Sequence, residues 1–209
     1  MLGKLLVISP HKDDETLGCG GLLSKTESDL IHIRYYNTYH PLVDQSLYDA
    51  EANQVAKTLD CWTSEAPFKR VNELDQFPIS WHIHDIEQAI NDWEPDTLLL
   101  PFPDYNQDHR HLFNASITAS RIHDKNFRVK SVLAYEQPST LQTNRFEPQF
   151  IPHLFIPIDI EKKLALYRIY QSQQRGHRTE DMVKSLAAIR GMQCGVPYAE
   201  AFMIVRMTA

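Results

Sequence analysis

The sequence contains little cysteine and has no long apolar run. Its three cysteines, Cys19, Cys61 and Cys194, are too few and too scattered for a disulfide framework, and no two have zinc-finger spacing. No stretch is apolar over the length that a membrane-spanning helix needs. The start of the chain, residues 1–5, lacks the apolar region and cleavage site of a signal peptide. We therefore expect a cytoplasmic protein with buried thiols and no membrane span.

Basic charge is also scarce. The formal net charge is −6, because 27 Asp and Glu residues outnumber 21 Lys and Arg residues. No nucleic-acid partner is expected, since binding to phosphates requires a basic surface. Gly18, Gly20 and Gly21 do not form the G-x-G-x-x-G fingerprint, which argues against a dinucleotide site. We expect these glycines to let the first helix pack closely on a sheet.

Strand-like and helix-like segments alternate along the chain. The length of 209 residues predicts one domain, residues 1–209. Strands are expected at residues 5–8, 31–36, 97–100, 129–135 and 154–158, and helices at 15–25, 46–59, 84–93, 109–123, 159–174 and 179–190. This alternation predicts an α/β fold with a mainly parallel sheet and helices on both faces.

Acidic and histidine residues gather after two of the expected strands. Residues 11–15, His-Lys-Asp-Asp-Glu, follow the first strand, and residues 104–111, Asp-Tyr-Asn-Gln-Asp-His-Arg-His, follow the strand at 97–100. In parallel sheets, functional loops lie at the carboxyl ends of strands. The two clusters would therefore face one crevice if these two strands are neighbours.

A metal ion would explain the crowded acids of the first cluster. Carboxylates so close together repel one another, whereas a dication turns them into ligands. His11 and Asp14 are close enough in sequence for one loop to direct both at an ion. His109 would complete the three protein ligands that a catalytic zinc usually has. Zn²⁺ suits these ligands, and Fe²⁺ or another divalent metal would also fit.

Two aspartates beside the expected ligands suggest further roles. Asp13 lies between two ligand positions, so its carboxylate could point at the water on the metal. As a general base it would take the proton of that water, and it could return the proton to a departing amine. Asp108 precedes His109 and could orient an imidazole from outside the ligand set.

These motifs resemble those of a known family. Residues 11–15 resemble the His-Pro-Asp-Asp-Glu motif of the LmbE-like/PIG-L family of zinc-dependent de-N-acetylases, and residues 104–109 resemble its second motif. A weaker likeness continues through residues 134–140, 172–173 and 195–202. The resemblance thus spans nearly the whole chain, and the paired first and second motifs are specific.

The resemblance implies a fold, a cofactor and a reaction. The fold would be Rossmann-like, with zinc held at His11, Asp14 and His109 and with Asp13 as the base. The reaction would be hydrolysis of an N-acetyl group from an amino sugar carried on a small-molecule conjugate.

This sequence departs from the family pattern at two positions. Lys12 replaces the usual proline, and its charge could offset the neighbouring acids. Asn106 stands where several family members carry a histidine that is thought to steady the oxyanion or protonate the leaving amine. Asn106 can donate a hydrogen bond but no proton, which favours Asp13 in both proton-transfer roles. His40 is a candidate acid from outside the two motifs.

Other polar residues lie near the same strand ends. We expect Glu15 to start a helix, and Tyr135 and Glu136 to be candidates for contact with the substrate. Tyr198 and Glu200 are expected to pack or to form a structural salt bridge.

Two alternative functions remain open. The same site could hydrolyse an amide or ester of a non-sugar N-acyl compound, or the chain could be a binding relative without catalysis. An intact Asp13 beside the ligands counts against the second alternative. The sugar, its aglycone and the oligomeric state, a homo-oligomer included, remain open.

Overall fold

The computed structural model describes residues 2–37, 39, 43–68, 72–122, 127–142, 148–176 and 178–208. His40, the candidate acid, lies outside these residues. Within them the chain forms a mixed sheet in the order β3-β2-β1-β4-β5-β7-β6. The strands are β1 (Leu5–Ser9), β2 (Ile31–Tyr35), β3 (Trp62–Glu65), β4 (Thr97–Pro101), β5 (Ser131–Tyr135), β6 (Leu154–Pro157) and β7 (Ala199–Met207).

The sheet is parallel from β3 to β5 and antiparallel at β7. Strand β1 pairs in parallel with β2 on one side and with β4 on the other. The expectation of a mainly parallel sheet is confirmed. Because the chain moves from β1 to β2 and later returns to β4, the strand order reverses between β1 and β4. Such a switch point opens a crevice at the carboxyl ends of the strands. Both acidic clusters of the sequence follow these two neighbouring strands.

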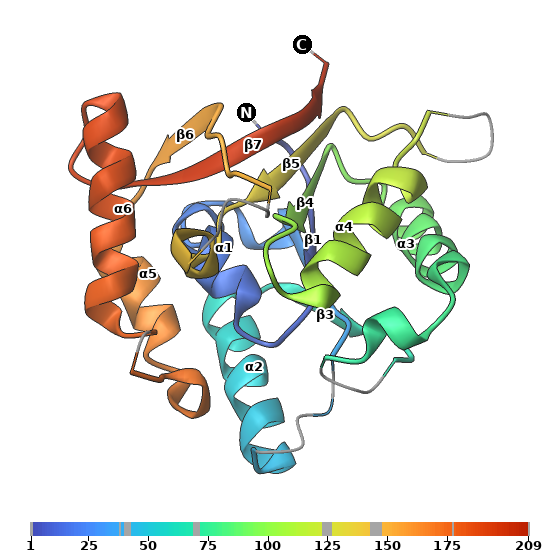
Figure 1. Ribbon diagram of the computed structural model, residues 1–209, viewed down its shortest axis with the longest axis horizontal. Coiled ribbons are helices and arrows are strands. Elements are labelled where there is room, and N and C mark those ends of the chain that lie inside the picture. Colours follow the sequence, from blue (N-terminus) through green and yellow to red (C-terminus); the bar gives the residue numbers. More distant parts are fainter. Residues whose placement is uncertain are drawn as a thin grey trace.

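Helices cover both faces of the sheet, as expected (Figure 1). They are α1 (Asp14–Leu23), α2 (Gln45–Leu59), α3 (Ile79–Trp93), α4 (Gln107–Ala119), α5 (Ile160–Tyr167) and α6 (Glu180–Cys194). Short 3₁₀ segments lie at η1 (Ser28–Leu30), η2 (Leu74–Gln76), η3 (Pro138–Gln142) and η4 (Gln171–Gln173).

Alternate residues of β1 face opposite cores, because side chains alternate along a strand. Leu5 and Val7 pack with residues of α1 and α2, whereas Leu6 and Ile8 pack with residues of α3 and α4. A third core joins the start of α1 to α5 and α6. The N-terminal turn of α1 is therefore packed against the C-terminal part of the chain.

Two strands were not expected from the sequence. Strand β3 is short and mostly exposed, so it lacks the apolar pattern of a buried strand. Strand β7 is buried on both faces in its first half, yet Glu200 interrupts its apolar pattern. Glu200 is tolerated there because its carboxylate is fully paired, as described below.

The expected helix at 159–174 is too long. Helix α5 ends at Tyr167, and η4 follows after a break at Tyr170. The break directs the hydroxyl of Tyr170 into the core, where it donates to Glu15 at 2.7 Å. The helix therefore ends near a buried polar contact, although the apolar periodicity of the sequence continues beyond this point.

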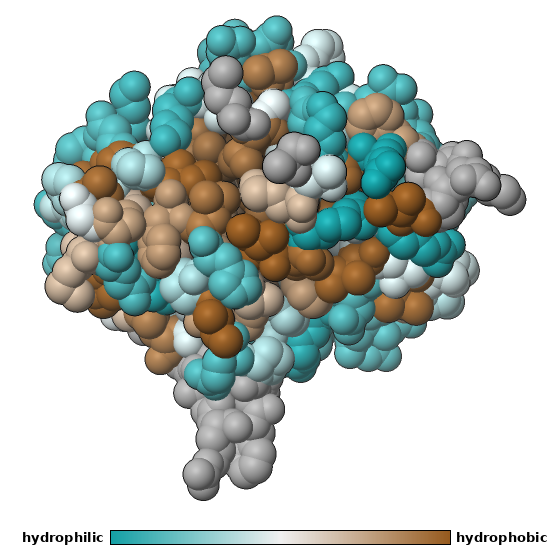
Figure 2. Space-filling model, turned by 90° about the horizontal axis from the view of Figure 1, so that it is seen from above, coloured by the Kyte–Doolittle hydropathy of each residue, from teal (hydrophilic) through white to brown (hydrophobic). Residues whose placement is uncertain are grey.

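Apolar residues gather across the face shown in Figure 2, which is seen from the end where β6 and β7 lie in Figure 1. Strand β6 is an edge strand of the sheet, and exposed apolar side chains nearby include Ile151 and Met207. Among the described residues, no helix is long and apolar enough to cross a membrane.

Candidate metal centre

A tight turn after β1 brings His11 and Asp14 together. The backbone N–H groups of Asp13 and Asp14 both donate to the C=O of His11, at 3.1 and 3.3 Å. The N–H of His11 donates in return to Oδ2 of Asp14 at 2.9 Å. Helix α1 begins at Asp14, so an acid lies in its first turn, where the helix dipole favours negative charge.

Three side chains from the two clusters converge on one point. Nδ1 of His11 lies 2.9 Å from Oδ2 of Asp14, and Nε2 of His109 lies 3.3 Å from the same oxygen. The two inner ring nitrogens, His11 Nδ1 and His109 Nε2, are 3.3 Å apart. All three ligand atoms lie within 4.8 Å of one another. The structure therefore brings together the three residues that the sequence suggested as ligands.

The outer nitrogen of each histidine faces an aspartate. His11 Nε2 lies 3.1 Å from Oδ2 of Asp108, and His109 Nδ1 lies 3.0 Å from Oδ2 of Asp104. Metal-binding histidines usually donate their second N–H in this way, which fixes the tautomer and the ring orientation. His11 Nδ1 and His109 Nε2, the inner nitrogens, are therefore the atoms that would face a bound cation, once they have lost their protons.

Both outer aspartates are held in turn. Asp108 accepts hydrogen bonds from the side-chain amide of Asn37 at 2.7 Å and from the backbone of Asn72 and Leu74 at 2.7 and 3.0 Å. Asp104 accepts from the hydroxyl of Ser139 and from the backbone N–H of Asn106. Asp104 belongs to the second motif, but the sequence alone does not indicate its contact with His109.

The donor set fits a divalent cation. Oδ1 of Asp14 is buried and has no hydrogen-bond partner. Burial opposes charge on the imidazoles, but Asp14 and the outer aspartates outweigh it and raise the pKa of His11 to about 9 and that of His109 to about 10. Burial also opposes charge on Asp14, yet His109 and His11 lower its pKa well below the usual value. This point of the molecule therefore stabilises positive charge, and two imidazoles with one carboxylate suit zinc or iron.

Asp13 is directed at an arginine from the far end of the chain. Its Oδ2 lies 3.2 Å from Nη1 of Arg178. Asp13 is only 1% exposed, and burial raises its pKa to about 6 against the opposing charge of Arg178. Burial and charge together leave Asp13 able to exchange a proton near neutral pH.

The position of Arg178 is set by its backbone. Arg178 and Arg175 form an antiparallel bridge, and the hydroxyl of Tyr167 donates to the C=O of Arg178 at 2.7 Å. The sequence pattern suggested only a break between two helices at this segment. No periodicity or motif marks Arg178, so its role depends on tertiary structure.

Asn106 caps helix α4. Its Oδ1 accepts from the backbone N–H of Asp108 at 2.8 Å, which is the usual N-cap bond. Because the cap uses the carbonyl oxygen, the NH₂ end of this amide is directed away from the helix. The amide is thus held by the loop that carries Asp104 and Asp108.

Lys12 does not offset the charge of its neighbours. Its ammonium group is buried and forms ion pairs with Asp49 at 2.5 Å and with Glu65 at 2.8 Å. These partners lie on α2 and β3. The expectation that its charge offsets the neighbouring acids was wrong, because Lys12 instead links the turn after β1 to α2 and β3.

Glu15 lies in the first turn of α1, as expected, but it is fully buried. It accepts hydrogen bonds from Tyr170 at 2.7 Å, Thr16 at 2.9 Å and Ser9 at 3.1 Å. Burial raises its pKa to about 7, although the hydrogen bond from Tyr170 lowers it. Through these hydrogen bonds, Glu15 stabilises the turn between β1 and α1 from its buried side.

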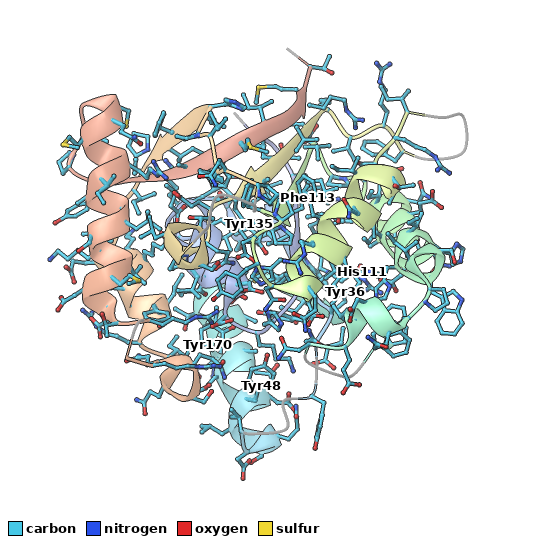
Figure 3. All side chains as sticks on the ribbon, in the orientation of Figure 1. Tyr36, Tyr48, His111, Phe113, Tyr135 and Tyr170 are labelled. Atoms are coloured by element: carbon cyan, nitrogen blue, oxygen red, sulfur yellow. The ribbon has the colours of Figure 1, made fainter. Side chains whose placement is uncertain are left out.

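Tyr135 and Glu136 are not placed to contact a substrate, so that expectation was wrong. Tyr135, labelled in Figure 3, is completely buried and donates to the C=O of Ile8 at 2.8 Å. A methyl group at Gly18 would lie 2.2 Å from its ring, which explains the close packing of α1. Glu136 is buried and is bound by the guanidinium of Arg190.

Comparison with known proteins identifies the family. Residues 6–120 match the family model described as PIG-L, GlcNAc-PI de-N-acetylase. The chain belongs to this family. The matched range contains both clusters, and it confirms the resemblance inferred from them.

A curated protein is similar to this PIG-L-family chain over nearly its whole length. Diacetylchitobiose deacetylase from Thermococcus kodakarensis is 25% identical over 221 residues, covering 97% of this chain and 83% of that protein.

Two solved structures share the fold. N,N'-diacetylchitobiose deacetylase from Pyrococcus horikoshii, bound to its inhibitor MPG, has a TM-score of 0.77 and 20% identity, covering 97% of this chain and 84% of that one. GalB, the 4-carboxy-2-hydroxymuconate hydratase from Pseudomonas putida, has a TM-score of 0.77 and 17% identity, covering 99% and 98%. One fold therefore serves both a deacetylase and a hydratase, so the reaction must be argued from the site.

Proposed function

We propose that this chain is a metal-dependent hydrolase that removes the N-acetyl group from an N-acetylated amino-sugar conjugate. The observation that carries the proposal is the convergence of His11, Asp14 and His109 beside the buried carboxylate of Asp13. The family description and the deacetylase names of its relatives support an N-acetylated sugar as the substrate.

The three ligand residues are prepared for a divalent cation. Asp108 and Asp104 bind the outer nitrogens of the two imidazoles, so that the inner nitrogens face the cation position and release their protons when a cation binds. Zn²⁺ or Fe²⁺ held there would supply Lewis acidity toward the amide carbonyl and would lower the pKa of water.

Asp13 acts as the general base in this proposal. Its carboxylate takes a proton from the attacking water, a contribution of about 10²- to 10⁴-fold to the rate. Arg178 keeps the carboxylate ionised and fixes its direction. Asp13 then gives this proton to the amide nitrogen as the C–N bond breaks, so that the product leaves as a neutral amine; Asn106 has no proton to supply.

Asn106 assists as a hydrogen-bond donor. Its carbonyl oxygen is engaged in the helix cap, so its NH₂ group is the end available to the acetyl oxygen. A donor at that place stabilises negative charge that develops on the oxygen in the transition state. Asp108 contributes through His11 and takes no part in proton transfer.

The proposal is tested on purified protein of measured metal content. Acetate release is followed with N-acetylglucosamine, N,N'-diacetylchitobiose and N-acetylglucosaminyl conjugates, and with N-acetyl amino acids as non-sugar amides. Release from the sugar compounds supports the proposal. Release only from the amino acids would move the substrate class to non-sugar amides, and full metal occupancy without release from any compound would favour a binding protein.

A further inference from the structure

Helix α1 is interrupted at Cys19, whose φ of −142° and ψ of 17° are not helical. In a regular helix, the N–H of residue 21 donates to the C=O of residue 17. Here the N–H of Gly21 donates to Oε1 of Glu200 at 2.7 Å, and the C=O of Leu17 accepts from Nζ of Lys163 at 2.7 Å. Lys163 and Glu200 are themselves joined at 2.6 Å. The ion pair thus lies between two groups that a regular helix would join.

The ion pair is buried and well satisfied. Lys163 and Glu200 are each only 4% exposed. The second oxygen of Glu200 accepts from the N–H of Leu22 at 2.8 Å. A buried ion pair contributes little net stability compared with an apolar pair, because desolvation offsets the attraction. Its main effect here is geometric, because its hydrogen bonds fix the two halves of α1 on either side of the break.

The break allows the two halves of α1 to pack against different cores. Leu17 packs with residues of α5 and α6, including Leu164. Leu22 and Leu23 pack against the sheet. The first half is a single turn, and it begins with Asp14. The direction of this first turn therefore depends on the side chains that bind the backbone at the break.

We propose that Lys163 and Glu200 are positioning residues for the metal centre. They come from α5 and β7, far from both motifs in sequence, and they fix the direction in which the first turn of α1 presents Asp14 to His109. The inference rests on the proposed function in one respect, because it takes His11, Asp14 and His109 as the ligands. Neither positioning residue touches a ligand side chain.

Zinc affinity is the first measurement, made by competition with a chelating dye on chelator-treated protein. Glu200→Gln loses one of the two acceptors for the N–H groups of α1, and Lys163→Met loses the donor to Leu17. Each variant is expected to raise the zinc Kd about tenfold, the lower end of what partners outside the ligand set usually contribute. Lys163→Arg keeps the charge and the donors and is expected to restore most of the affinity.

A matched control separates positioning from general destabilisation. Asp85 is also buried and is bound by Arg34 at 2.5 Å and by Tyr36, on the other face of the sheet. Asp85→Asn is expected to lower Tm as Glu200→Gln does, but to leave the zinc Kd unchanged. If Glu200→Gln and Lys163→Met lower Tm and bind zinc like the wild type, the pair is structural only and the positioning role is wrong.

Hydrogen exchange provides a readout that needs no metal. In chelator-treated protein, the amides of residues 14–18 are expected to exchange faster in Glu200→Gln than in the wild type, whereas Asp85→Asn leaves them unchanged. Unchanged exchange in Glu200→Gln would overturn the proposal. If the wild type binds no zinc, the proposed function fails, and the exchange result still decides whether the pair fixes this turn.

Discussion

The guanidinium of Arg178 lies 3.2 Å from the carboxylate of Asp13, although 165 positions separate them in the chain. The contact places a permanent positive charge beside a buried acid whose pKa burial raises to about 6. The C-terminal part of the chain thus controls the ionisation of a residue in the first motif.

Removal of this charge should shift the pH profile of the reaction. Asp13 must be ionised to act as a base, so kcat/KM falls as the pH drops through its pKa. Arg178→Met removes the charge that lowers this pKa, and the acid limb of kcat/KM is expected to move to higher pH. Arg168→Met, which removes an exposed arginine paired with Glu180, is the control and should leave the limb in place. An unshifted limb in Arg178→Met would show that Asp13 is not the group that titrates.

Asp108 should affect metal binding through His11. Asp108→Asn weakens the hydrogen bond to Nε2 of His11 and is expected to raise the zinc Kd by about 10- to 100-fold. Competition with a chelating dye measures the effect, with Asp85→Asn as a control of similar burial. Equal zinc affinity in the two variants would contradict the assignment of His11 as a ligand.

Glu15 should make the metal-free protein less stable as the pH rises. Its folded pKa is about 7, above the ordinary value of 4.5, so the folded state prefers the neutral acid. Its contribution to stability is complete below about pH 4.5 and is lost as the pH rises through 7. Glu15→Gln cannot ionise, so its stability relative to the wild type should improve by about 1–3 kcal/mol between pH 5 and pH 8. Urea unfolding at the two pH values measures the difference, and a constant difference would contradict the raised pKa.

The contact between Gly18 and Tyr135 leaves no room for a side chain. A Cβ at Gly18 would lie 2.2 Å from the tyrosine ring, whereas a Cβ at Gly20 would have no neighbour closer than 3.4 Å. Gly18→Ala is expected to destabilise the fold by about 1–3 kcal/mol. Gly20→Ala is the matched control in the same helix and should cost less. Urea unfolding compares the two, and equal losses would argue against this packing.

Much of the site could be predicted from the sequence because its residues lie in two short motifs. Each motif follows a recognisable apolar strand, and parallel strands bring their carboxyl ends to one edge. The placement of His11, Asp14 and His109 follows from that geometry. The fold class follows from the same alternation of strands and helices.

Other parts depend on long-range contacts that no local pattern records. Arg178 reaches Asp13 from a loop between helices, and Tyr135 is used in the core although it ends a strand at the functional edge. Strand β7 contains a glutamate that is acceptable in a buried strand only because Lys163 and the broken helix α1 satisfy it. In each case a partner distant in sequence determines the role.

The central claim is that His11, Asp14 and His109 hold a divalent metal on which N-acetyl hydrolysis depends. Its most direct test is a titration of chelator-treated protein with Zn²⁺ or Fe²⁺, in which bound metal and acetate release from N,N'-diacetylchitobiose are measured together. We predict that activity rises with occupancy up to one equivalent, and that His109→Ala shows neither binding nor release. Acetate release that persists after complete removal of metal, or that survives in His109→Ala, would contradict the claim.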